Sequence, residues 1–174
     1  MLWTAGLLVA LCIGSSTVSS QPAYSEDLVK AVLLERIVTF LSWSTDGVDS
    51  PVELVVLGEG TLGREVQRVY SRRKFAGRPV AVRFAEKLED IGKAHIVIIG
   101  RDHAADLNEV LGACASQGVL TVGDTPGFGE RGVAINFYRD GTRVRFEVAP
   151  RALKRAGIKA SYKLLTLARV VGGT

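Results

Sequence analysis

The sequence has few of the side chains that metal centres, disulfides and nucleophilic catalysis require. Its 174 residues include two cysteines and two histidines. His95 and His103 have no second histidine or cysteine at the spacing of a metal-binding motif. No stretch supplies an acid, a base and a nucleophile together, and Ser42 and Ser44 have no base near them in sequence. We therefore expect no catalytic residues, no metal and no cofactor.

The two cysteines do not predict a disulfide within the folded chain. Cys12 lies in an apolar segment that we expect to be removed, which leaves Cys114 alone. Cys114 stands between two alanines in an expected helix, where a small packed thiol is the ordinary interpretation. An unpaired thiol in an exported protein can also pair between chains, so an interchain disulfide remains an alternative.

Charged side chains are missing from the first twenty residues. An apolar run from Leu2 to Ile13 is followed by small and polar residues that suit a leader peptidase. A helix of that length rises about 18 Å, which is too short to span a hydrocarbon core of about 30 Å. We interpret residues 1–20 as a signal peptide that is cut between Ser20 and Gln21. Residues 21–174 then form a single periplasmic domain with no membrane span.

Acidic side chains are missing from the C-terminal tail. From Val148 to Thr174 the chain has six basic residues and no acid: Arg151, Lys154, Arg155, Lys159, Lys163 and Arg169. A second cluster is diluted only by Glu65 and comprises Arg64, Arg68, Arg72, Arg73, Lys74 and Arg78. Both clusters fit solvated faces, or a surface for an acidic partner domain or an anionic membrane. Nucleic acid is not an expected partner, because no aromatic side chains are interleaved with the basic ones.

Hydrophobic periodicity predicts an α/β fold. Apolar residues at helical spacing follow a candidate N-cap at Ser25, and short apolar runs predict buried strands. The expected helices cover 26–43, 62–73 and 102–117, with two helical pieces in the tail that are separated at Gly157. The expected strands cover 52–58, 77–85, 95–100, 119–124, 133–141 and 142–150. This order predicts a three-layer α/β/α domain with a mixed sheet of about six strands, the first four largely parallel and the last two an antiparallel hairpin.

The stretch from Val119 to Val171 resembles the YfiR family of exported proteins. The shared pattern is an LTVGD strand, a PGF loop, an INF strand, a VRFE strand and a tail that contains RAGIKAS. The earlier half agrees in its FLSW and AHIVIIG segments, so the resemblance covers essentially the whole chain after the leader. Members of this family bind the periplasmic domain of an inner-membrane diguanylate cyclase and hold it inactive. The resemblance therefore implies a non-enzymatic, homodimeric repressor that lowers cyclic-di-GMP.

The family often carries two cysteines that this chain lacks. One lies in the first strand and one just before the third, where this chain has Val55 or Val56 and Ala94. The resemblance therefore does not extend to redox control through that bridge. Some relatives are associated with histidine kinases, so the alternative hypothesis is a small-molecule-binding protein that feeds a sensor kinase.

A glycine motif follows the first strand. Gly58, Gly60 and Gly63 spell G-x-G-x-x-G between a strand and a helix, which is the layout of a dinucleotide-binding turn. Exported compartments offer little nucleotide, and the YfiR family usually reads LGDDPFG at this turn. We therefore interpret Gly58 and Gly63 as structural residues that allow a tight turn and close packing of helix on strand.

Candidate partner-binding residues come from the PGF loop, the hairpin and the tail. Phe128, between Gly127 and Gly129, either anchors its loop or contacts a partner. Glu147 alternates with Phe146 and should face the opposite way, toward solvent or a partner. The candidate set is Phe128, Glu147, Arg151, Lys154, Arg155 and Lys159. Structural roles are expected at Gly58, Gly63, Gly127, Asn136, Phe137 and Phe146, with Asn136 holding the loop and the two phenylalanines forming a cross-strand core pair.

Overall fold

The computed structural model describes residues 25–42 and 50–172. The predicted leader, its cleavage between Ser20 and Gln21, and the predicted helix end at Trp43 lie outside the described residues. The described chain forms α1 (Glu26–Val38), α2 (Thr61–Tyr70), α3 (Leu107–Ser116), α4 (Pro150–Arg155), α5 (Tyr162–Leu167) and the 3₁₀ turns η1 (Leu88–Ile91) and η2 (Arg101–Ala104). Its strands are β1 (Leu41–Ser42), β2 (Val52–Leu57), β3 (Val80–Ala85), β4 (Ile96–Ile99), β5 (Leu120–Gly123), β6 (Ile135–Asp140), β7 (Arg143–Val148), β8 (Lys159–Ala160) and β9 (Arg169–Val170).

One mixed sheet organises the fold, in the strand order β3-β2-β4-β5-β6-β7-β9. The strands from β3 to β6 are parallel to their neighbours, β7 is antiparallel to β6, and β9 is parallel to β7. The predicted α/β class with a partly parallel sheet and a C-terminal hairpin is confirmed. The sheet has seven strands rather than about six, because the tail adds β9 beside Glu147 and Val148. A separate pair joins β1 to β8.

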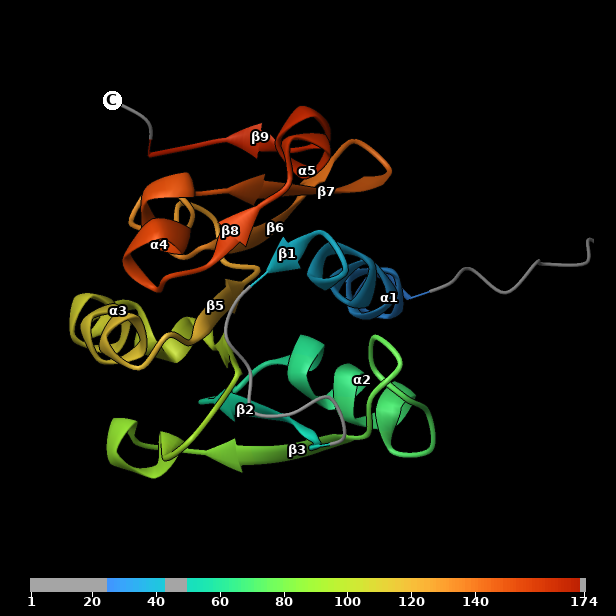
Figure 1. Cartoon of the computed structure of the whole chain (residues 1–174), viewed down its shortest axis with the longest axis vertical. Coiled ribbons are helices and arrows are strands. Elements are labelled where there is room, and N and C mark those ends of the chain that lie inside the picture. The colour runs from blue at the N-terminus through green and yellow to red at the C-terminus, as the bar shows by residue number, and fades with distance from the viewer. Residues whose placement is uncertain (1–24, 43–49, 173–174) are drawn as a thin grey trace, which may run out of the picture.

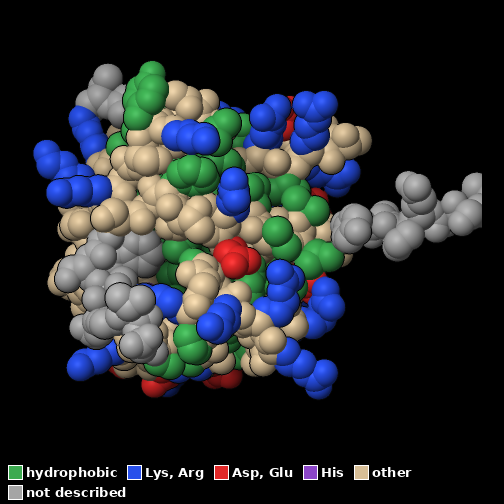
Figure 2. All heavy atoms as spheres, turned by 45° about the vertical axis from the view of Figure 1, so that its right-hand side comes forward, with side chains coloured by type: hydrophobic (Ala, Val, Ile, Leu, Met, Phe, Trp, Pro, Cys, Tyr) green, Lys and Arg blue, Asp and Glu red, His purple; other side chains and the backbone are tan. Residues whose placement is uncertain are grey.

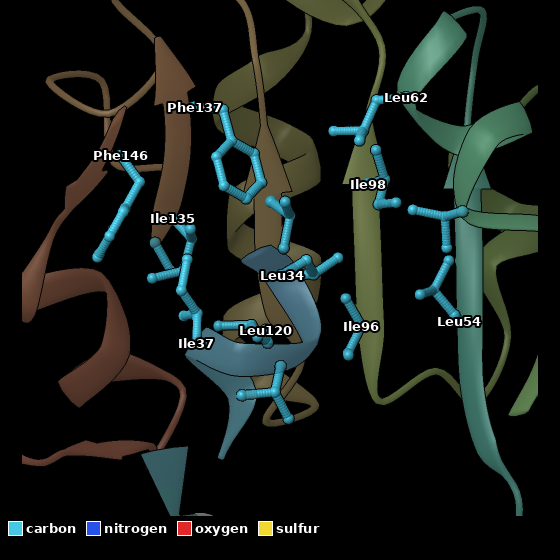
Figure 3. Close-up of a cluster of buried hydrophobic side chains, with 14 of the residues drawn as sticks. Leu34, Ile37, Leu54, Leu62, Ile96, Ile98, Leu120, Ile135, Phe137 and Phe146 are labelled. Carbon is cyan, nitrogen blue, oxygen red and sulfur yellow. The ribbon is translucent and has the colours of Figure 1, made fainter. Parts of the chain in front are cut away.

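Helices cover both faces of the sheet, as predicted for a three-layer domain (Figure 1). Along β2, alternate side chains point to opposite faces. Leu54 packs in one cluster with Leu34 of α1 and Leu62 of α2. Val55 packs in the other cluster with Val110 of α3. Figure 3 shows the first cluster, where side chains of α1 lie against those of the central strands.

The first helix begins where the sequence predicts and ends earlier. The Ser25 hydroxyl accepts the N–H of Leu28 at 3.2 Å, so Ser25 is the N-cap. The helix stops at Val38, and β1 then pairs with β8 instead of continuing as helix. The N–H of Ser161 donates to the carbonyl of Phe40 at 3.0 Å, which secures that pairing. The predicted helix was therefore wrong over residues 39–42, because tertiary pairing overrides local propensity.

The third predicted helix is divided into η2 and α3. His103 has non-helical dihedral angles, and α3 begins only at Leu107. Two aspartate side chains on this segment form hydrogen bonds that are not part of the helix. Asp102 accepts the N–H of Glu59, and Asp106 contacts the His103 ring. Side chains that bond to nearby groups compete in this way with helix formation.

Candidate functional site

A polar hollow of about 1060 Å³ lies at the carboxyl ends of β2, β4 and β5. From β2 the chain moves to β3 on one side and later returns to β4 on the other, so this is the switch point of the sheet. Open α/β sheets commonly bind ligands at such a point. We call it the switch-point hollow. Its lining includes Glu26, Asp27, Lys30, Glu59, Gly60, Thr61, Arg64, Arg101, Asp102, Asp124, Thr125, Asn136, Tyr138, Arg139, Glu147 and Arg169.

The glycine motif forms one wall of this hollow, and two of its glycines fit tight spaces. Gly58 has a φ of 79°, and a Cβ there would collide with the Asp102 carboxylate and the His103 ring. Gly63 lies on α2, where a Cβ would collide with the Val56 side chain of β2. Gly60 has no atom near its Cβ position. Gly58 therefore allows a tight turn, and Gly63 allows close contact between α2 and β2.

Asp102 occupies the position at this turn where a phosphate binds in nucleotide-binding folds. The backbone N–H of Glu59 donates to both carboxylate oxygens of Asp102 at 3.1 Å. A fixed carboxylate beside these amides repels an anionic ligand and already uses one of the donors. The turn therefore satisfies its own amide with an acid from η2, which disfavours a pyrophosphate.

Lys30 joins α1 to the end of β5 across the hollow. Its ammonium lies 2.8 Å from Glu26, 3.4 Å from Asp27 and 2.9 Å from Asp124, with 8% of its side chain exposed. Burial alone would lower the pKa of Lys30, but the hydrogen bonds that its ammonium donates to Glu26 and Asp124 raise it to about 12. Lys30 is therefore charged at physiological pH, and its acids are used internally rather than offered to a ligand.

The PGF loop is packed against the sheet. Phe128 is 1% exposed and lies among side chains of the α3 face. The Asn136 amide donates to the carbonyl of Thr125 at 3.1 Å and to Glu147 Oε2 at 2.9 Å. Phe128 therefore anchors the loop. Because its side chain is buried, the expectation that it contacts a partner directly is corrected. Asn136 holds the loop.

Glu147 is 2% exposed, which corrects the expectation that it faces solvent or a partner. It does point away from Phe146, but that side is covered by the loop, where a Cβ on Gly129 would collide with its carboxylate. Glu147 forms an ion pair with Arg169 of β9, whose guanidinium lies 4.1 Å from the centre of the Tyr138 ring. The hydrogen bond to Glu147 raises the pKa of Arg169. Glu147 thereby links β6, β7, β9 and the loop.

The remaining hairpin residues have structural positions. Phe137 and Phe146 are directly opposite each other on β6 and β7, and both are buried. Gly127 has a φ of 82° at the turn that leads into the loop. The Asn136 side-chain oxygen is buried and accepts no hydrogen bond within the described part of the chain.

The basic tail residues lie on the surface. Arg151, Lys154 and Arg155 on α4 and Lys159 on β8 are all exposed. The second cluster is less uniform, because Arg78 is half-buried and donates to the carbonyl of Ser50 at 2.7 Å. Arg64, Arg68, Arg72, Arg73 and Lys74 of that cluster are exposed, so both clusters present positive charge on the surface.

The histidines and the cysteine have packing roles. His95 Nδ1 accepts the N–H of Glu53 at 3.0 Å, and His103 Nδ1 lies 3.0 Å from Asp106 and lowers the pKa of that carboxyl. Cys114 is 1% exposed, and burial raises the pKa of its thiol to about 11. Among the described residues, no three His, Cys, Asp or Glu side chains gather as metal ligands do.

The sequence did not reveal three residues that shape the site. Lys30 and Asp124 are 94 positions apart, and Asp102 is 43 positions from the amide that it accepts. Only the parallel sheet brings them together, since the carboxyl ends of its strands share one edge. An acid directly after a buried strand, as at Asp124, was the one available signal.

Comparison with solved structures shows the fold. The chain is similar to a conserved domain protein from Vibrio cholerae, with a TM-score of 0.60, 12% identity and 84% of the chain covered. It is also similar to an ABC domain in complex with L-Trp from Streptococcus pneumonia, with a TM-score of 0.57, 11% identity and 83% covered. The matched part corresponds to 60% of each of those chains.

No curated protein matches the chain. Within the described residues, none of the helices is long and apolar enough to cross a membrane. The sequence profile of the YfiR/HmsC-like proteins matches residues 27–169, from the first turn of α1 to the start of β9. The chain therefore belongs to the YfiR/HmsC-like family.

Proposed function

We propose that this protein is a periplasmic regulator that binds the extracytoplasmic domain of an inner-membrane signalling protein and represses it. The family match over nearly all of the folded chain carries the proposal. The expected partner is a diguanylate cyclase, whose restraint lowers cyclic-di-GMP. Repression requires that the regulator bind the inactive conformation more tightly than the active one, because equal affinity for both shifts no population.

The arrangement of polar groups in the switch-point hollow supports binding rather than catalysis. The acids near Lys30 are held by its ammonium, and Glu147 is held by Asn136 and Arg169. Asp102 accepts a backbone N–H. A general base needs a free, correctly placed acceptor, and these carboxylates are already engaged in structural contacts.

The exposed tail supplies a surface for encounter with the partner. Arg151, Lys154, Arg155 and Lys159 carry positive charge on α4 and β8, and such a patch speeds association with an acidic surface. Phe128 and Glu147 act indirectly in this proposal, by fixing the loop and strand beside the patch. A homodimer remains part of the proposal, because a symmetric pair could engage a dimeric membrane receptor.

A crosslinked pull-down of the mature protein from the periplasm tests this function. We expect a membrane protein with a diguanylate cyclase or kinase domain, identified by mass spectrometry. Reversing Arg151, Lys154 and Lys159 to Glu should reduce its recovery severalfold. A matched control reverses Arg72, Arg73 and Lys74, which are also exposed, and should leave recovery unchanged. Recovery of this chain alone would overturn the proposal.

A small-molecule sensor that feeds a kinase is the second candidate, and the switch-point hollow favours it. The hollow has the volume of a ligand site and lies where α/β sheets bind ligands. Calorimetric titration with metabolite mixtures and purified protein would detect such binding. Because the Asp102 carboxylate accepts the backbone N–H at the glycine turn and repels anions, a neutral or zwitterionic ligand is expected rather than a phosphate.

A further inference from the structure

The outward face of α1 is apolar. Val29 is 40% exposed and Val32 is 46% exposed, and Leu33 and Phe40 are half-buried beside them. A surface helix normally presents polar side chains to solvent and apolar ones to the core. This helix instead carries apolar residues on both sides, with Leu34 and other residues buried beneath. Such a face is typical of a helix that packs against a second partner.

The described parts of the chain leave that face open. Their most extensive contacts with α1 come from α2, β1 and β7, whereas Val29 and Val32 keep 40% and 46% of their surface exposed. A hollow of about 620 Å³ lies beside Val29, between the first turns of α1 and the β6–β7 hairpin. It is lined by Glu26, Val29, Arg139, Thr142, Arg143, Val144 and Arg145. Figure 2 brings this side forward and shows apolar side chains lying between Lys and Arg side chains.

The charges around the apolar centre are mainly positive. Arg36, Arg139, Arg143 and Arg145 are exposed there, against the acids Glu26 and Asp140. Arg139 lies 3.8 Å from Glu26 and Arg145 lies 3.8 Å from Asp140, so each acid has a partner within the surface. The net charge of this group is therefore positive. An acidic partner complements it, whereas a second copy of this basic chain would bring two positive surfaces together.

We propose that this α1–hairpin surface, formed by Val29, Val32, Leu33, Val144, Arg36, Arg139, Arg143 and Arg145, docks an acidic amphipathic helix of the membrane partner. The inference rests on the proposed function and adds a docking surface for the partner, distinct from the basic tail that steers its encounter. Val29, Val32 and Leu33 stand at the i, i+3 and i+4 positions, which share one face of α1 and suit packing against a second helix. The arginines then pair with acids that flank the partner's apolar stripe.

Site-specific photo-crosslinking in living cells tests this surface. A benzophenone side chain replaces Val32, and a second strain carries it at Phe84 of β3, which has a matched exposure of 47% at the opposite end of the sheet. Crosslinked peptides are sequenced by mass spectrometry. We expect the Val32 probe to label an acidic, apolar-striped segment of a membrane signalling protein, and the Phe84 probe not to label it.

Other outcomes of this experiment overturn the inference. A Val32 crosslink to a second copy, to residues 21–24 or 43–49 of this chain, or to nothing at all excludes an acidic partner on this face. If the pull-down captures a cyclase but the Val32 probe does not label that protein, the proposed function stands and this surface assignment fails. If neither captures a membrane protein, the proposed function fails as well.

Binding kinetics with the purified extracytoplasmic domain of the captured protein give a second readout. Val32→Glu should weaken affinity at least tenfold, because it places an acid in the apolar centre against an acidic partner, whereas Phe84→Glu should change it less than twofold. Arg143→Glu should slow association about tenfold at low salt, and the effect should shrink as salt is raised. Equal behaviour of Val32→Glu and Phe84→Glu would contradict the proposal. Both positions are exposed, so folding is preserved and can be verified by circular dichroism.

Discussion

Lys30 offers the sharpest test of how the structure is held together. Its ammonium is the only cation that the structure places between Glu26, Asp27 and Asp124 in the described part of the chain. The contact to Asp124 ties the first helix to the end of the central strand β5. Replacing Lys30 with Met keeps a long apolar stem and removes the charge, so the three acids lose their shared partner.

The magnitude follows from the pKa of Lys30. A rise from 10.5 to about 12 corresponds to about 2 kcal/mol of stabilisation of the charged form. Glu26 and Asp124 are partly exposed, so screening by water reduces the expected loss to about 1–2 kcal/mol. For a chain of this size that loss lowers Tm by about 3–6 °C. Because the folded pKa is raised, the contribution is complete below pH 10.5 and is lost as pH rises through about 12.

Urea unfolding monitored by circular dichroism measures this difference. Lys30→Met should be less stable by a constant amount between pH 7 and pH 9, and the gap should narrow above pH 10.5. Lys154→Met is the control, since Lys154 is exposed on α4, and it should be nearly neutral. A Lys30→Met protein as stable as the wild type at pH 7 would refute the reasoning. A gap that widens at high pH would also refute it.

Three further perturbations test the packing. Gly63→Ala should lower the free energy of unfolding by about 1–3 kcal/mol, because the new Cβ would collide with Val56 of β2. Gly112→Ala lies in open space on α3 and should raise it by up to about 1 kcal/mol. Chemical denaturation measures both variants, and equal effects would contradict the packing argument. Glu147→Gln should lower stability by about 1–2 kcal/mol and speed hydrogen exchange at residues 125–132, and unchanged exchange would show that Glu147 does not hold the loop. Cys114 should resist Ellman's reagent until the protein unfolds, and a disulfide dimer on a non-reducing gel would contradict its burial.

The parallel core was predictable because its strands are nearly continuous apolar runs. The segments at 52–58 and 95–100 are buried on both faces, so local sequence and tertiary position agree. The hairpin turn at Gly141 was equally clear, since its φ of 59° requires a residue such as glycine. In these segments every local preference points to the same structure.

The tail was harder to predict because its strands have two residues each. β8 and β9 form only because β1 and β7 offer them partners, and no periodicity can appear over two residues. Glu147 illustrates a related limit. Alternation correctly placed Glu147 on the other face of β7 from Phe146, but alternation does not reveal that a loop covers that face. The contacts of Lys30 and Asp102 likewise depend on elements far away in sequence.

We propose that this protein represses a cyclase by binding it. The most direct test measures cellular cyclic-di-GMP by mass spectrometry in a strain that lacks the protein and in strains that regain it. The account predicts that the deletion raises the nucleotide level and that the wild-type protein lowers it again. The variant with Arg151, Lys154 and Lys159 reversed to Glu should fail to lower it, while the Arg72, Arg73 and Lys74 control succeeds. An unchanged or lower level in the deletion strain would contradict the claim.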